Sequence, residues 1–406
     1  MDGPGGKIPQ NSSSDSPGFT LVVSYYAPPE IGGASAVMYE LLRHFPSDSL
    51  TLLKAAAKPD SPRGDRRIDI RTLTLKSSLW LTRLEMPSFL LIPFTIFRVA
   101  SYFKRMGTRP RNILAVFPSL EFLLISLFLS KFLSIPLYVY LHDCIVETAR
   151  GHPRKELAKV AEIWTFRSAT KVYALSGAMK GFYERKGLGS KIGLLPHGVD
   201  SKLLREFENR PCTNPVRVGF AGMVYETNDS AFKDLVEAKR ISNGRLEIHL
   251  ATSRDSRAWL VRIGVADSID SISTIEIHEK LVSFLSNCDV LFLPLNFESP
   301  FYYDLLTVFP TKVTDYWLAQ RPILVYGPRE YAFVAEASDD GYAKVVHRRG
   351  GKNILDAVDE ICASPSMREA LVKSSRRMID LHDSKEFVKT LMMDLGILSS
   401  DPSLDN

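Results

Sequence analysis

The sequence predicts an α/β protein built from two doubly wound domains, each a parallel sheet covered by helices. The chain has 406 residues, which exceeds one ordinary core and suits two domains. Apolar, strand-like runs alternate with helical segments in both halves, as is typical of parallel sheets. The alternation restarts after a polar, proline-containing stretch at 206–215. We therefore expect a first domain at 19–200 and a second at 201–384, joined near residues 196–214.

The first domain begins with a strand-like run at 19–26, followed by a loop rich in proline and glycine. The next segment has apolar residues at helical spacing from Ala34 to Phe45, which predicts a helix. Further strands of this domain are expected at 113–117, 137–141, 171–176 and 191–195. Residues 1–18 lack the apolar run of a signal peptide, and we expect them to form a disordered tail.

The second domain opens with a strand-like run at 216–222. Its further strands are expected at 246–251, 274–278, 290–294, 322–326 and 343–347. Ligands of doubly wound sheets bind at the carboxyl ends of the strands, so two facing sheets place the site in a cleft between the domains. Residues 385–406 are expected to form a C-terminal helix, from Lys385 to Leu395, and a tail. This helix is a candidate to pack back on the first domain.

The composition, 45% hydrophobic and 24% charged, is that of a soluble globular protein. It excludes a disordered, collagen-like or disulfide-stapled chain. The four cysteines have no metal-ligand spacing, which indicates reduced thiols in a cytoplasmic protein. They are Cys144, Cys212, Cys288 and Cys362.

Charge is distributed unevenly along the chain. Residues 1–200 carry 26 Lys and Arg against 16 Asp and Glu, whereas residues 201–406 carry 25 against 30. A basic first half indicates an anionic partner such as phosphates or a lipid surface. Nucleic acid is not an expected partner, because the basic residues do not alternate with aromatic ones in a nucleic-acid-binding pattern.

Two segments are apolar enough to raise the question of a membrane. The run 122–141 is long enough to span a bilayer, but Pro136 divides it into a helix and a strand, so we expect a buried β-α-β unit. The segment 79–105 mixes aromatic and basic residues and is interrupted by two prolines. It is interpreted either as an interfacial segment that lies on a membrane or as a pair of core helices with basic ends.

Two motifs of the first domain could contact a ligand. Gly32 and Gly33 lie between a strand and a helix, where their backbone N–H groups can approach an anion. The alternative is a tight turn that needs glycine. His142 and Asp143 follow an apolar strand, where they can bond a ligand hydroxyl, or else serve as a rim histidine and a capping residue.

Two further motifs lie at the domain junction and in the second domain. The run 195–200, Leu-Pro-His-Gly-Val-Asp, is interpreted as a hinge. In the run 309–326, a helix opening at Thr311 and Lys312 would direct N–H groups and an ammonium toward a diphosphate. Asp315 lies one turn further along and can accept hydrogen bonds from a ribose diol. The alternative for Lys312 is a solvated surface charge.

Taken together and in this order, the four motifs resemble those of the GT-B fold glycosyltransferases. The resemblance is to the large retaining family of the family 4 type, which includes bacterial polysaccharide and lipopolysaccharide sugar transferases, and it extends over residues 19–396. The run 287–294 also resembles the Ala-Asp-Val strand that precedes the nucleotide site in this family. The resemblance implies two Rossmann-like domains facing each other across a cleft, the first binding the acceptor and the second the nucleotide sugar.

The resemblance also implies roles for single residues. Gly32 and Gly33 match the glycine loop near the donor phosphates. His142 matches the histidine that contacts the transferred sugar, and Asp143 is its neighbour on the sugar or acceptor side. Lys312 would act at the departing diphosphate, so His142 and Lys312 are the candidate catalytic residues.

The remaining donor-binding candidates come from the second domain. Gly222 and Thr311 would lie at the diphosphate, and Asp315 matches the second of two carboxylates that bind the ribose, where the family usually has glutamate. For the first carboxylate, counting forward from Pro294 selects Glu298 and counting back from Asp315 selects Thr307.

Three departures from the family pattern stand out. Met223 follows Gly222 where the family has arginine, and the loop 224–229 contains neither Arg nor Lys. The loop 297–309 is longer than usual and contains three aromatic residues between Phe301 and Tyr303. His197 stands in the hinge where asparagine is common.

The function expected is transfer of a sugar from a nucleotide-sugar donor to a glycan or lipid-linked saccharide in surface polysaccharide biosynthesis, with retention at the anomeric carbon. No DxD triplet occurs, so we expect no metal and no other cofactor. The expected location is cytoplasmic, with peripheral contact at the inner face of the membrane through residues 79–105. The alternatives are a catalytically silent GT-B module that binds a partner glycosyltransferase or glycan, and a sugar-nucleotide 2-epimerase.

Overall fold

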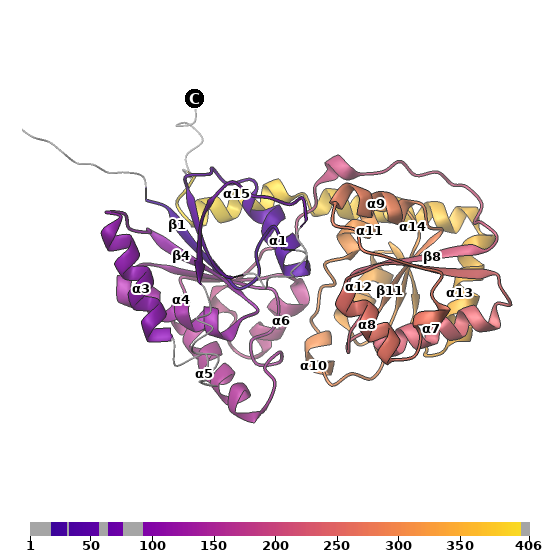
Figure 1. The fold of residues 1–406 in the computed structure, drawn as a ribbon, viewed down its shortest axis with the longest axis horizontal. Coiled ribbons are helices and arrows are strands. Elements are labelled where there is room, and N and C mark those ends of the chain that lie inside the picture. The colour runs from indigo at the N-terminus through magenta and orange to yellow at the C-terminus, as the bar shows by residue number, and fades with distance from the viewer. Residues whose placement is uncertain (1–17, 31, 57–63, 76–91, 399–406) are drawn as a thin grey trace, which may run out of the picture.

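The computed structural model describes residues 18–30, 32–56, 64–75 and 92–398. Within these residues the chain forms two α/β domains side by side, each built on one parallel sheet (Figure 1). The predicted fold class is therefore confirmed. The predicted terminal tails and residues 79–91 of the aromatic and basic segment lie outside the described residues.

The first domain has a seven-stranded sheet in which all strand pairs are parallel. The strand order is β3-β2-β1-β4-β5-β6-β7. The strands are β1 (Thr20–Ser24), β2 (Leu50–Ala55), β3 (Arg71–Leu75), β4 (Asn112–Phe117), β5 (Leu137–Leu141), β6 (Lys171–Ala174) and β7 (Ile192–Leu194). The helices are α1 (Gly33–Leu42), α3 (Ile92–Arg105), α4 (Leu120–Leu133), α5 (His152–Ser168) and α6 (Gly177–Arg185).

The second domain has a six-stranded parallel sheet in the order β10-β9-β8-β11-β12-β13. The strands are β8 (Val216–Ala221), β9 (Leu246–Ala251), β10 (Ser271–Ser273), β11 (Val290–Pro294), β12 (Ile323–Tyr326) and β13 (Ala343–Val346). The helices are α7 (Asp229–Ile241), α8 (Arg254–Arg262), α9 (His278–Ser286), α10 (Tyr302–Leu305), α11 (Val313–Ala319), α12 (Ala332–Asp339), α13 (Gly351–Ala363) and α14 (Pro365–Leu381).

The apolar run 122–141 forms the buried β-α-β unit that was expected. Strand β4 is buried along its whole length. Helix α4 starts at the cap Ser119, whose hydroxyl accepts from the N–H of Phe122, and ends at Ser134 in the left-handed conformation. Strand β5 follows directly. In the described part of the chain, no helix is both long and apolar enough to cross a bilayer.

Three strands at or next to a sheet edge differ from the expectation. Strands β2 and β3 were not predicted, and β3 is partly exposed, so its sequence lacks a continuous apolar run. The strand expected at 274–278 instead occupies Ser271–Ser273, where it pairs with β9. It ends before His278 because this residue already begins helix α9.

The expectation of four reduced cysteines is wrong for one pair. Cys212 and Cys362 form a disulfide, with Cα atoms 5.5 Å apart. The two residues are separated by 150 positions, so only the tertiary fold brings them together. The bond ties the segment between the domains to the end of helix α13. Cys144 and Cys288 are free and buried.

The C-terminal helix α15 (Ser384–Asp394) lies on the first domain, as the yellow helix above the indigo strands shows (Figure 1). Asp394 accepts hydrogen bonds from Lys171 and Tyr173 of β6, both at 2.6 Å. The chain thus crosses between the domains twice, and Val199 pairs with Asp383 where the two crossings meet.

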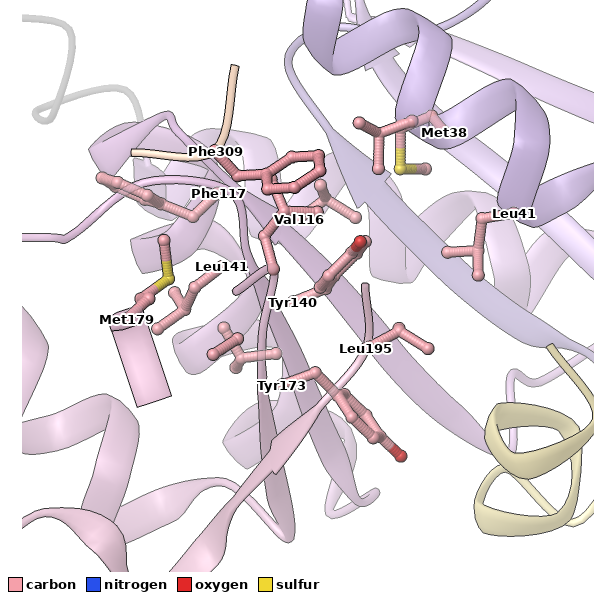
Figure 2. Packing of buried hydrophobic residues seen from close by; sticks show 14 of the residues in the cluster. Met38, Leu41, Val116, Phe117, Tyr140, Leu141, Tyr173, Met179, Leu195 and Phe309 are labelled. Atoms are coloured by element: carbon pink, nitrogen blue, oxygen red, sulfur yellow. The ribbon is translucent and has the colours of Figure 1, made fainter. Parts of the chain in front are cut away.

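Apolar packing is continuous across the junction between the domains. Phe309, from the second domain, is buried in one cluster with Val116 and Tyr140 of the first domain. Figure 2 shows its ring beside these two side chains. The strand order reverses between β1 and β4 in the first sheet and between β8 and β11 in the second. Doubly wound sheets bind ligands at such reversals, so the loops after β1 and β8 are the expected place for a ligand.

Candidate active site

The glycines after β1 and β8 both contact the segment that begins helix α11. A Cβ atom added to Gly33 would lie 2.6 Å from Oγ1 of Thr311, so a larger residue would collide there. Gly222 has a φ of +130°, and a Cβ atom on it would lie 3.4 Å from Nζ of Lys312. The structure therefore brings together Gly33, Thr311, Lys312 and Gly222, which we call the lysine region.

Lys312 is a largely buried cation. Its Nζ atom lies 4.5 Å from the centroid of the Phe220 ring. Burial lowers the pKa of Lys312 to about 7. Within the described ranges, no carboxylate forms an ion pair with this ammonium. Because a buried charge is normally paired, the lysine region is suited to an incoming anion.

Asp315 has its charge compensated within the protein. Its Oδ1 atom lies 2.7 Å from Nε2 of His278 and 3.7 Å from Nη2 of Arg66. Burial alone would raise the pKa of Asp315, but His278 and Arg66 outweigh burial and lower it. Arg66 belongs to the first domain, so this contact joins the two domains. Sequence reasoning missed both partners because neither is near Asp315 in the sequence.

Two buried histidines lie near the junction without hydrogen-bond partners for their rings. His142, directly after β5, has neither ring nitrogen bonded to another described residue, and the same is true of His197 in the segment between the domains. Burial lowers the pKa of each imidazole to about 3, so both are neutral at physiological pH. The ring of His142 packs edge-on against Tyr140, with centroids 4.5 Å apart.

Carboxylates gather near the end of β5. Asp143 and Asp304 are electrostatically coupled, and Glu147 also acts on Asp304. Burial raises the pKa of Asp143, and burial together with the charges of Asp143 and Glu147 raises that of Asp304. No described cation forms an ion pair with Asp143 or Asp304. We call this pair the carboxylate region.

Asp304 was not selected from the sequence, although the unusual length of its loop was noted.

The family match concerns the first domain. Residues 31–203 match the model of glycosyltransferase family 4. Solved structures match both domains. The structure of Anabaena HepE in complex with UDP-glucose matches with a TM-score of 0.67 and 13% identity, covering 93% of this chain and 99% of that one.

The chain is thus similar to glycosyltransferases of family 4 over its first domain. It has the GT-B fold, as expected from its motifs. A glycosyltransferase from Rickettsia africae matches with a TM-score of 0.61 and 10% identity, over 95% of this chain and 100% of that one. The apo form of the lipopolysaccharide outer core galactosyltransferase WaaB matches with a TM-score of 0.58 and 13% identity, over 93% and 100%. No curated protein matches the sequence.

The two candidates for the first ribose-binding carboxylate lie in different places. Thr307 lies at the domain junction, where its Oγ1 atom is 3.2 Å from Sγ of Cys144 and its carbonyl oxygen accepts from Ser176. The side chain of Glu298 is 87% exposed and lies 3.7 Å from Arg349. The structure does not bring Glu298 together with the other predicted residues.

Aromatic side chains from both domains lie around the carboxylate region. Asp143 raises the pKa of both Tyr26 and Tyr225, in each case after the larger effect of burial. Arg150 of the first domain lies 4.4 Å from the ring centroid of Phe301 in the second domain. The same arginine is 3.4 Å from Glu226. Side chains of both domains therefore border the carboxylate region.

Proposed function

We propose that this protein is a glycosyltransferase of the family 4 type, which moves a sugar from a nucleotide-sugar donor to a glycan or lipid-linked saccharide in surface polysaccharide biosynthesis, with retention at the anomeric carbon. The observation that carries the proposal is Lys312, a largely buried ammonium without a carboxylate partner among the described residues. It lies where the glycine contacts of both domains meet. A diphosphate supplies the missing negative charge.

We assign the donor diphosphate to the lysine region. Lys312 binds the phosphate oxygens and stabilises the charge that grows on the departing group. Gly33 and Gly222 allow the backbone to approach, since side chains there would occupy the space next to Thr311 and Lys312. The HepE complexes with UDP and UDP-glucose support a uridine nucleotide as the first donor to test.

The ribose is assigned to Asp315. His278 holds its Oδ1 atom, and Oδ2 is available to accept from a ribose hydroxyl. His278 and Arg66 keep the carboxylate ionised, which strengthens that hydrogen bond. Because His278 and Arg66 compensate the charge of Asp315, no unpaired negative charge of this residue lies beside the diphosphate.

The transferred sugar and the acceptor are assigned to the side of His142 and Asp143. In a retaining front-face reaction, the acceptor oxygen bonds to the anomeric carbon as the bond from that carbon to the phosphate oxygen breaks. The acceptor proton passes to the departing phosphate, so no protein base is required. His142 is neutral, and its unpartnered ring nitrogens can bond sugar hydroxyls. We propose that no metal takes part, because Lys312 supplies positive charge at the diphosphate.

The test is transfer from radiolabelled UDP-, GDP-, dTDP- and ADP-sugars to lipid and glycan extracts, with and without Mg²⁺. One donor class should label an acceptor, and NMR of the product should show the anomeric configuration of the donor. Product with inverted configuration would contradict the retaining mechanism. Release of free UDP and an epimerised sugar without an acceptor would favour the 2-epimerase.

A catalytically silent module remains a second candidate on one specific observation. The loop after Gly222 lacks any Arg or Lys through position 229. A silent module would bind a partner glycosyltransferase or glycan and show no turnover with any donor. Turnover that disappears in Lys312→Ala would contradict it. The proposed location, in either case, is the cytoplasm with peripheral attachment to the inner face of the membrane.

A further inference from the structure

Helices α3, α4 and α5 form a large apolar groove outside the active site. The groove has a volume of about 1300 Å³. The three helices lie next to one another on the lower left of the first domain (Figure 1). Its lining is dominated by apolar side chains, including Ile96, Phe97, Leu124, Phe128, Phe132 and Trp164.

Large side chains of the groove are exposed to a degree that soluble proteins usually avoid. Phe97 of α3 is 67% exposed and Phe132 of α4 is 64% exposed, while Trp164 of α5 is 41% exposed. Helix α3 buries Val99 and Phe103 on its opposite face. Single exposed apolar residues are common, but a continuous apolar hollow contributed by three helices marks an interaction site.

The charges around the groove are mainly positive. Helix α3 contains three basic residues, Arg98, Lys104 and Arg105, and no acidic one. Lys131 of α4 lies 5.7 Å from the ring centroid of Trp164. Glu121 of the lining is paired with Arg154 at 3.0 Å. Basic side chains beside exposed aromatic rings are what an anionic lipid surface attracts.

We propose that this groove is the surface by which the enzyme docks on an anionic bilayer, with lipid acyl chains entering between α3, α4 and α5. The charge of the rim favours lipid headgroups, and the apolar lining favours hydrocarbon. The volume of the groove, about 1300 Å³, provides space for acyl chains between the helices.

A series of aromatic contacts links the edge of the groove to the active site. Phe122, next to the lining residues Leu120 and Glu121, contacts Tyr25 with ring centroids 5.5 Å apart. Tyr25 in turn contacts Tyr26, with ring centroids 4.8 Å apart. The pKa of Tyr26 is raised by burial, by Tyr25 and by the charge of Asp143. A docked bilayer therefore meets the protein beside the acceptor side of the site. Resting on the proposed function, this inference names the acceptor class as a saccharide whose lipid anchor stays in the membrane.

The experiment measures binding to vesicles of phosphatidylcholine with about 30% phosphatidylglycerol, and to vesicles of phosphatidylcholine alone. The wild type should float with the anionic vesicles and lose most of this binding when the lipid charge is removed or salt is raised to about 0.5 M. The double variant Phe97→Glu with Phe132→Glu should bind at least tenfold more weakly. The matched control is Val261→Glu, which changes an apolar residue of helix α8 that is also 64% exposed.

A second readout locates the contact. Vesicles with brominated acyl chains should quench wild-type fluorescence more than that of Trp164→Phe, because Trp164 lines the groove. Equal quenching of the two proteins, or unchanged vesicle binding by the double variant, would overturn the proposal. A wild-type dimer that the double variant abolishes would also overturn it.

The proposed function is tested separately on the same proteins by nucleotide binding. Failure to bind vesicles with intact nucleotide binding would count against the groove alone. Loss of nucleotide binding by the wild type would count against the proposed function.

Discussion

The lysine region and the carboxylate region both lie at the domain junction. One holds a basic group and the other holds acidic groups, and none of these groups has an ion-pair partner among the described residues. Burial lowers the pKa of Lys312, whereas burial raises the pKa of Asp143 and of Asp304. This difference supports the proposed placement of a nucleotide sugar, with its diphosphate at Lys312 and its uncharged hydroxyl groups near the carboxylates.

Removing the cation tests the lysine region most severely. Lys312→Ala should lower kcat/KM by about a hundredfold or more, since it removes a group that stabilises charge on the departing diphosphate. Lys312→Arg keeps the charge and should retain part of the activity. Steady-state kinetics with the identified donor measure both variants. Unchanged turnover in Lys312→Ala would place the diphosphate elsewhere.

Neutralising one carboxylate tests the other region. Asp304→Asn should lower kcat by about tenfold while leaving nucleotide affinity within about twofold, because Asp304 interacts electrostatically with Asp143 and not with Lys312. The same change should raise Tm at pH 7, because wild-type Asp304, whose pKa is raised to about 8, must bind a proton on folding, whereas asparagine binds none. Glu298→Gln is the matched control at an exposed carboxylate and should change neither quantity. A loss of nucleotide affinity in Asp304→Asn would contradict the assignment of separate roles to the two regions.

The pH dependence of donor binding sharpens the comparison further. An anionic diphosphate favours the protonated form of Lys312, whose pKa in the free protein is about 7. Above pH 7 binding must therefore take up a proton, and Kd should rise by up to about tenfold per pH unit. Calorimetry with UDP-glucose, whose diphosphate does not titrate in this range, measures the effect. The slope should vanish in Lys312→Arg, and a wild-type Kd that is flat from pH 7 to 9 would contradict the assignment.

The smallest expected effect concerns stability rather than binding. The pKa of His197 is about 3 in the folded protein and about 6.5 when unfolded, so the unfolded state binds more protons between these values. The contribution is fully present above pH 6.5 and is lost as pH falls, at about 1.4 kcal/mol per pH unit. His197→Asn should lower the slope measured by urea unfolding between pH 6.5 and 5 by about 1.4 kcal/mol per pH unit, and the similar contribution of His142 should remain. An unchanged slope would show that His197 is protonated without penalty.

The sequence predicted central elements well because their burial leaves a continuous apolar pattern. Strands β4, β5 and β11 are nearly fully buried, and all three were predicted. The edge strand β3 was missed because half-exposed positions interrupt that pattern. The disulfide was missed for a different reason, since no spacing rule reaches across 150 residues.

The candidate site was predictable where glycine or charge follows a strand within one segment. Lys312 and Gly222 were selected separately from the sequence, and the fold places them in contact. Asp304 and Arg66 could not be selected, because their roles depend on partners from the other domain. Glu298 shows the converse, since counting along the sequence selected a residue that the fold leaves exposed beside Arg349.

The most direct test of the central claim is nucleotide binding by the wild type and Lys312→Ala, measured by thermal shift with UDP, GDP, dTDP, CMP and ADP. A nucleotide at a hundred times its Kd stabilises a protein by about 2.7 kcal/mol. We predict that one nucleotide raises the wild-type midpoint without metal and that Lys312→Ala abolishes the shift. An equal shift in both proteins, or none in the wild type, would contradict the claim that the buried lysine is the diphosphate site.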